Sequence, residues 1–247
     1  MSFFVMSGRS RAMGERSRSN PSSLATCRSS RAGSGVVRIV GGKWRRSPLA
    51  VASRAGLRPT PERVRETVFD WLNHLLGSLE GLEALDLFAG SGAMGLEAAS
   101  RGAARVRLIE KNGESAAKID ESVRRLKGED RCSVVRGDAF ELIRADAGLY
   151  DVIFIDPPYD ALLQVKAAAA ALERMKEEGL LYIERPEGSA LDLTGLPLTC
   201  VRRGTAGQVV FELYARNGSF MAGQAKLPKE KLTKAQKAQL KRKEEAQ

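Results

Sequence analysis

The feature that most constrains this chain is a regular alternation of short apolar runs and helical stretches. The apolar runs lie at 83–88, 105–110, 132–136, 151–155 and 180–184, and the helical stretches lie near 93–101, 113–127, 139–145 and 161–177. Strands that alternate with helices pair in parallel, because each helix returns the chain to the same edge of the sheet. We therefore expect an α/β fold built on a doubly wound, mostly parallel sheet.

The two ends of this alternating region follow other patterns. Residues 196–203 and 208–215 predict two strands of an antiparallel C-terminal β-hairpin, joined at 204–207, which brings the sheet to seven strands. Upstream, 36–40 predicts a short strand and 61–76 an amphipathic helix. Thr60 is the expected N-cap of that helix, and Pro61 suits its first position.

The chain carries a net charge of +10, and the placement of this charge matters more than its size. Residues 1–35 carry +5, 36–65 carry +7 and 226–247 carry +5, whereas 66–225 carry −7. A basic edge and two basic tails around an acidic body are typical of proteins that bind a polyanion such as nucleic acid. The tails alone also fit a purely solubilising role.

Cysteine and histidine usage excludes several classes of protein. Cys27, Cys132 and Cys200 lie far apart and form no metal-binding pair, and His74 is the single histidine. No apolar run reaches the roughly 18 residues that span a membrane. We expect no metal, no membrane association and a cytoplasmic protein.

The first apolar strand opens into a glycine loop. Ala84 to Phe88 lead into Gly90, Ser91, Gly92 and Gly95, a G-x-G-x-x-G motif between a strand and a helix. Glycines let the backbone approach a ligand closely and turn into the helix. Alone, the motif fits a dinucleotide, a nucleoside cofactor or no ligand.

Acidic residues at successive strand ends narrow that choice. Asp86, Glu110, Asp138 and Asp156 stand at the carboxyl ends of four strands, where open α/β sheets bind ligands. Glu110 follows Gly90 by 20 residues, the spacing of a carboxylate that holds ribose hydroxyls. Each carboxylate also fits a capping role. Because S-adenosylmethionine has an ammonium and a sulfonium, it is the expected cofactor, bound by Asp86, Phe88, Gly90, Ser91, Gly92, Gly95, Glu110, Asp138 and Ala139.

The fourth strand ends in Asp156, Pro157, Pro158 and Tyr159, the expected catalytic residues. Two prolines stiffen the turn and remove two N–H donors. An exocyclic amine on a base is a weak nucleophile, and two acceptors aimed at its hydrogens localise its lone pair. We expect the Asp156 carboxylate and the Pro157 carbonyl to be these acceptors, with Tyr159 stacked on the base.

The glycine loop and this tetrapeptide together resemble Rossmann-like, class I amino-methyltransferases. More closely, 36–216 resembles the RsmD-type 16S rRNA (guanine-N2)-methyltransferase family. Gly-Gly-Lys-Trp-Arg at 41–45 and Leu-Arg-Pro-Thr at 57–60 are the most discriminating stretches, beside 63–67, 86–98 and 156–159. The resemblance implies methylation of a guanine N2 amine in 16S rRNA, within an assembled or assembling small ribosomal subunit. It also implies that Arg58, Thr60, Arg63 and Arg65 border the cofactor and RNA entrance.

These interpretations divide the chain into four parts. We expect a disordered basic extension at 1–35, a basic strand–helix segment for RNA and cofactor entrance at 36–80, an S-adenosylmethionine-binding catalytic domain at 81–217 and a lysine-rich tail at 218–247. The expected RNA contacts are exposed cations that bind phosphates, namely Lys43, Arg45, Arg46, Arg58, Arg63 and Arg65. Trp44 fits either base stacking or a core role.

Alternatives from other classes remain at this point. Methyltransferases for adenine N6 of DNA or RNA, or for protein glutamine, use related turns, although no target-recognition insertion interrupts the strands. A nicotinamide-dependent oxidoreductase explains the glycine loop but leaves 156–159 without a role. A non-catalytic RNA-binding assembly factor explains the charge but not the intact Asp156.

Overall fold

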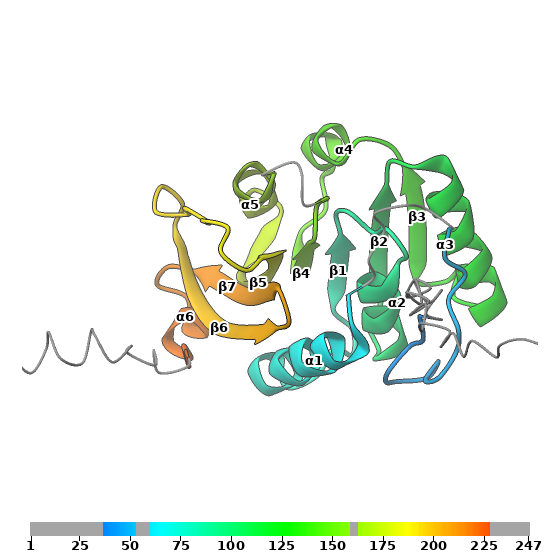
Figure 1. Ribbon diagram of the computed structural model, residues 1–247, viewed down its shortest axis with the longest axis horizontal. Helices are drawn as coiled ribbons and strands as arrows, with labels where there is room; N and C mark the ends of the chain where they lie inside the picture. Colours follow the sequence, from blue (N-terminus) through cyan, green and yellow to red (C-terminus); the bar gives the residue numbers. More distant parts are fainter. Residues whose placement is uncertain (1–36, 53–59, 159–162, 228–247) are drawn as a thin grey trace, which may run out of the picture. The chain divides into compact units, whose positions relative to one another are not determined.

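A seven-stranded sheet forms the centre of the computed structural model, which describes residues 37–52, 60–158 and 163–227 (Figure 1). The strand order is β3-β2-β1-β4-β5-β7-β6. The strands are β1 (Glu83–Asp86), β2 (Arg105–Glu110), β3 (Cys132–Arg136), β4 (Tyr150–Ile155), β5 (Met175–Pro186), β6 (Leu198–Ala206) and β7 (Val209–Arg216).

The first five strands pair in parallel, and β7 pairs antiparallel with both β5 and β6. The structure confirms the expected mostly parallel sheet and its C-terminal hairpin, in which β6 runs three residues farther than predicted, to Ala206, and leaves only 207 and 208 before β7. Because β1, β2, β3 and β4 run in the same direction, their carboxyl ends lie along one edge of the sheet.

Helices cover both faces of the sheet. Buried side chains of α1 (Glu62–Leu76), α2 (Ala93–Ser100) and α3 (Gly113–Leu126) share one apolar cluster with the sheet. Those of α4 (Ala139–Ala145) and α5 (Gln164–Leu172) share a second cluster on the other face. Alternate residues of one strand enter different clusters, Phe154 the first and Ile153 the second, as the period of a strand requires.

Two expected elements differ from the structure. The helix expected at 161–177 ends at Leu172, and β5 begins at Met175 rather than at 180, because Met175 pairs with Tyr150 before a register shift. The strand expected at 36–40 is reduced to one bridge between Arg38 and Pro48.

Thr60 does not cap α1. The N-cap position is Pro61, which makes no side-chain cap, and the Thr60 hydroxyl turns toward the carboxyl ends of β4 and β5 instead. Its capping role was therefore wrong, and its expected place at the cofactor and RNA entrance stays a prediction.

A buried glutamate fastens the N-terminal segment to the sheet. Glu97 of α2 is fully buried, and its two carboxylate oxygens accept hydrogen bonds from the N–H groups of Val40 and Gly41, both at 2.7 Å. The same carboxylate pairs with Arg65 at 3.4 Å and with Arg101 at 2.8 Å. One side chain thus joins the segment at 37–52, helix α1 and helix α2.

The glycines at 41 and 42 serve this attachment. Gly42 has a φ of 75°, and a β-carbon there would overlap the carbonyl group of Ser100. The next N–H groups bind Ser100, that of Lys43 its carbonyl oxygen at 2.7 Å and that of Trp44 its hydroxyl at 2.9 Å. Trp44 is buried, so its core role is the one observed.

The chain after β7 stays on the sheet through residue 227. A short helix, α6 (Phe220–Gly223), contributes Met221 to the first apolar cluster, and the N–H of Lys226 binds the Val201 carbonyl at 2.9 Å. Met221 and the backbone of Lys226 therefore contact the sheet, although we expected both residues in the tail. Among the described helices, none is long and apolar enough to cross a membrane.

Glu97→Gln should destabilise the fold by about 3–5 kcal/mol, because it leaves the buried guanidinium of Arg65 without a counter-charge. Urea denaturation measures the change. Glu121→Gln, which removes an exposed partner of Lys118 on α3, is the matched control and should leave the free energy of unfolding nearly unchanged. Equal effects of the two substitutions would contradict the role given to Glu97.

Candidate functional site

The glycine loop lies between β1 and α2, at the carboxyl edge of the sheet. Gly90 and Gly92 have φ values of 55° and 73°, a backbone conformation that favours glycine. Gly95 lies close to the next strand, since a β-carbon there would stand 2.7 Å from a Leu108 methyl. Ser91, between these glycines, is buried.

Asp86 anchors this loop from beneath. Its buried carboxylate accepts a hydrogen bond from the N–H of Gly95 at 2.9 Å. Burial raises the pKa of Asp86 to about 7, the Gly95 bond acts against this increase, and the charge of Glu110 adds to it. Its expected interaction with a cofactor stays a prediction.

Glu110 lies at the end of β2 and holds the loop from the side. One of its oxygens accepts from the N–H of Gly90 and the other from the N–H of Asn112, both at 2.8 Å. The carboxylate is half-buried, so it is fixed in direction while part of it faces solvent. It stands beside the glycine loop, where we expected a protein carboxylate that binds the ligand.

Asp138 is a capping residue in this structure. One oxygen accepts from the N–H groups of Phe140 and Glu141 at the start of α4, and the other pairs with Lys111 at 3.1 Å. The hydrogen bond from Lys111 holds the pKa of Asp138 below its usual range. Contact with a cofactor stays a prediction for Asp138, as it does for the buried Ala139 beside it.

Two aromatic rings border this edge. Phe88 follows β1 and Phe140 belongs to α4, and their centroids lie 6.1 Å apart in an edge-on arrangement. Both side chains are half-buried and pack against the second apolar cluster. The structure thus gathers the residues expected to bind a cofactor along one edge, from the ends of β1, β2 and β3.

Asp156 follows β4 directly and is half-buried, while Pro157 is buried and Pro158 exposed. Burial raises the pKa of Asp156 well above its ordinary value, and the charges of Glu184 and Asp86 add to this effect. Because β4 lies between β1 and β5 in the sheet, Asp156 follows the strand between those that carry Asp86 and Glu184. Tyr159 lies outside the described residues.

Sequence reasoning missed the neighbours of Asp156 on β5. Glu184 is buried, and its carboxylate accepts hydrogen bonds from the hydroxyl groups of Tyr182 at 2.8 Å and of Thr60 at 3.2 Å. The position of Glu184 at the end of an apolar run was a usable signal. The rule that singled out the other four acidic strand ends applies to it equally.

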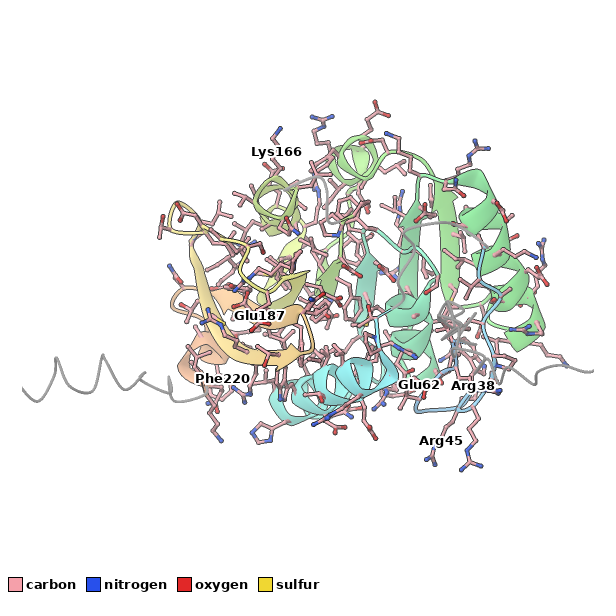
Figure 2. All side chains as sticks on the ribbon, in the orientation of Figure 1. Arg38, Arg45, Glu62, Lys166, Glu187 and Phe220 are labelled. Carbon is pink, nitrogen blue, oxygen red and sulfur yellow. The ribbon has the colours of Figure 1, made fainter. Side chains whose placement is uncertain are left out.

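The expected RNA contacts separate into exposed and buried residues. Lys43, Arg45, Arg46 and Arg63 are exposed (Figure 2 shows Arg45 pointing away from the sheet). Arg65 is fully buried, pairs with Glu97 and donates from Nε to the Thr60 carbonyl at 3.3 Å. Its RNA contact was therefore wrong, because a buried guanidinium cannot reach a phosphate. Arg58 lies outside the described residues.

The exposed loop at 43–46 does not adjoin the glycine loop. It attaches to Ser100 at the last residue of α2, whereas the glycine loop precedes the first residue, and the helix spans eight residues or about 12 Å. The exposed Arg125, at the end of α3, donates a hydrogen bond to the Pro48 carbonyl, and the exposed Lys127 follows it. Among the described residues no cluster of potential metal ligands occurs.

Comparisons with known proteins give this geometry a family context. The model of the family described as conserved hypothetical protein 95 matches residues 37–215. Ribosomal RNA small subunit methyltransferase D of Escherichia coli is 36% identical over 186 residues, which are 74% of this chain and 92% of that protein. A putative rRNA methyltransferase of Bacillus subtilis is 27% identical and is covered completely, together with 74% of this chain. Among solved structures, a putative methyltransferase from Escherichia coli aligns with a TM-score of 0.65 and 33% identity, over 75% of this chain and all of that one.

Asp86→Asn should become more stable relative to the wild-type protein as the pH rises. In the folded protein the pKa of Asp86 is raised to about 7, against an ordinary value of 3.8, so the stability contributed by its protonated form is present below about pH 4 and lost as the pH rises through 7. Relative to wild type, the free energy of unfolding of the variant should increase by about 1 kcal/mol or more between pH 5 and pH 8. Denaturation at both pH values measures this change. Asp70→Asn, at an exposed position, is the control. If the difference in free energy of unfolding between variant and wild type were independent of pH for both variants, Asp86 would not be a buried group that binds a proton on folding.

Proposed function

Because this chain belongs to the conserved hypothetical protein 95 family, as its match over 37–215 and its likeness to ribosomal RNA small subunit methyltransferase D establish, we propose that it methylates the N2 amine of a guanine in 16S rRNA, with S-adenosylmethionine as the donor. The observation that carries this proposal is the position of Asp156 and Pro157. Both residues directly follow β4, the strand paired with β1, which ends in the carboxylate that anchors the glycine loop, and we propose that they act as a stiff acceptor pair.

The residues along the carboxyl edge fit S-adenosylmethionine. Three carboxylates, Asp86, Glu110 and Asp138, stand at the ends of neighbouring strands, and such an acidic set suits a cationic ligand that also carries ribose hydroxyls. Glu110 has two backbone donors and further acceptor capacity, so it is the proposed partner of the ribose. The loop at 90–95 is proposed to approach the ligand with its backbone. When bound, S-adenosylmethionine supplies an electrophilic methyl group on a sulfonium.

The acceptor pair acts on the substrate amine. The Asp156 carboxylate and the Pro157 carbonyl each accept a hydrogen bond from one N–H of the N2 amine. These two hydrogen bonds turn the lone pair of the amine away from the ring and toward the methyl group. As positive charge grows on the nitrogen, a fixed carboxylate and a fixed carbonyl dipole stabilise it without reorganisation. Holding both reactants in line supplies the remaining acceleration through proximity.

A base within a helix must leave the stack to reach Asp156. The proposed role of Tyr159, stacking on the extruded base, stays a prediction because this residue lies outside the described part of the chain. An rRNA substrate, in an assembled or assembling small subunit, is in keeping with the cytoplasmic location expected from the sequence.

We assign the phosphate contacts to the exposed cations of the loop at 43–46 and to Arg63. Arg125 and Lys127 extend this surface onto the end of α3, because the segment at 37–52 packs against that helix: the N–H of Ala50 binds the Ser122 hydroxyl at 3.1 Å. The loop attaches at the far end of α2 from the glycine loop. We therefore propose that the loop at 43–46 binds RNA phosphates some distance from the methylated base. Such a contact requires a folded RNA substrate rather than a short oligonucleotide.

Asp156→Asn should lower methyl transfer at least about a hundredfold while cofactor affinity changes little, because the amide loses the charge that stabilises the developing cation. Small subunits from a strain that lacks this enzyme are the substrate, and transfer of labelled methyl groups measures the rate. Calorimetry measures cofactor affinity, and Asp70→Asn is the control. A near-normal rate would exclude Asp156 as the catalytic acceptor.

Replacing Lys43, Arg45 and Arg46 together by Gln should reduce the slope of log K against log salt for RNA binding by about 2, since each phosphate contact contributes about 0.7–0.9. Arg144→Gln combined with Lys166→Gln removes exposed cations from α4 and α5 on the other face of the sheet, and this pair should leave the slope unchanged (Figure 2). An identical slope for wild type and the triple variant would remove the loop from the RNA surface.

A further inference from the structure

The hydroxyl group of Thr60 stands between two carboxylates on neighbouring strands. Its Oγ1 lies 3.2 Å from Oε2 of Glu184 and 3.5 Å from Oδ2 of Asp156. Strands β4 and β5 pair Ile155 with Ile183, so Asp156 and Glu184 occupy equivalent positions one residue farther along. The two acidic groups are thus brought together by the strand register itself.

Buried groups hold this arrangement in place. The hydroxyl of Tyr182, which is fully buried, donates to Glu184 at 2.8 Å. Arg65 donates from Nε to the carbonyl oxygen of Thr60, and Glu97 fixes Arg65 in turn. The position of Thr60 therefore depends on contacts that begin on α2 and end beside Asp156.

The chemistry of this cluster is asymmetric. A hydroxyl group has one hydrogen, so Thr60 donates to one carboxylate at a time, and the shorter distance favours Glu184. Two hydroxyl donors then stabilise Glu184 as an anion, whereas Asp156 receives the weaker interaction. Two neighbouring carboxylates disfavour double ionisation, and the less stabilised one takes up the proton.

The charged and titratable groups around Asp156 act in the same sense. Burial raises the pKa of Asp156, and the negative charges of Glu184 on β5 and Asp86 on β1 add to this effect. Tyr182 and Arg65 lie one contact farther away, on Glu184 and on the Thr60 backbone. Asp156 is consequently the member of the cluster suited to accept a proton.

We propose that Glu184 is a positioning residue that makes Asp156 the acceptor of the proton released by the methylated amine, with Thr60 fixing the spacing of the two carboxylates. This inference rests on the proposed function. In the step, a nitrogen–carbon bond forms and the methyl–sulfur bond breaks, its electron pair remaining on the donor's sulfur. The N–H bond breaks, its electron pair stays on nitrogen, and the proton forms an O–H bond on Asp156 before it passes to water.

The test compares pH–rate profiles at saturating cofactor and RNA. Activity falls at low pH when Asp156 is protonated, so Glu184→Gln, which removes the neighbouring charge, should move the midpoint of this acid limb to lower pH by at least half a pH unit. Thr60→Val removes a donor that stabilises the Glu184 anion, so the proton is shared more evenly between the two carboxylates and the midpoint should also move to lower pH, by less than in Glu184→Gln. Glu177→Gln removes a charge from an exposed site on β5 and should leave the midpoint in place.

A displaced midpoint separates this role from a structural one, which would lower the rate or the stability without moving the midpoint. If Glu184→Gln does not fold, Thr60→Val against Thr60→Ser carries the test, since serine retains the hydroxyl and should show a smaller displacement. An unmoved midpoint in the folded variants would overturn the proposal.

A second measurement does not depend on activity. Carbon-13 NMR of the carboxyl groups follows the titration of Asp156 in the full chain without substrate, with Asp156→Asn to assign the resonance. Glu184→Gln should shift this titration to lower pH, and an unchanged titration would contradict the inference. Absence of methyl transfer by the wild-type protein, by contrast, would refute the proposed function and leave this measurement interpretable.

Discussion

The fold depends on one buried carboxylate more than on any other polar group. Glu97 accepts hydrogen bonds from two backbone N–H groups and pairs with two arginines, and both Glu97 and Arg65 are fully buried. A buried charge is tolerated only when it is paired and hydrogen-bonded. Its partners come from three parts of the chain, so satisfying Glu97 requires the segment at 37–52, α1 and the end of α2 to reach their final positions together.

This constraint links the two ends of α2. The helix begins at the glycine loop, where the cofactor is proposed to bind, and ends at Ser100, where the cationic loop attaches. Arg65 extends the same network to Thr60 and so to Asp156. The proposed RNA surface, cofactor loop and catalytic carboxylate thus share rigid supports, which is what a reaction needs when its two substrates must be aligned.

Much of this site was predictable, because the periodicity of the chain places acidic residues at the ends of parallel strands without knowledge of tertiary contacts. What failed were the features that only packing decides. Met175 to Gly179 has the charged composition of a helix end, yet pairing with Tyr150 places it in a strand. Arg65 has the sequence context of an exposed cation, and only the buried Glu97 shows why it turns inward. Thr60 likewise has the position of a cap, and the carboxylates that it binds lie more than ninety residues away in the chain.

The gathering of Asp86, Asp156 and Glu184 is costly in electrostatic terms. Burial raises the pKa of both Asp86 and Asp156, and for Asp156 the like charges of Glu184 and Asp86 add to this effect. A purely structural strand end has no use for such a group, since apolar residues of similar volume would be at least as stable. A cationic methyl donor and an amine that gains positive charge both reduce this repulsion. In the proposed reaction these positive charges would relieve the repulsion, so part of the free energy that the clustered carboxylates cost would favour the transition state.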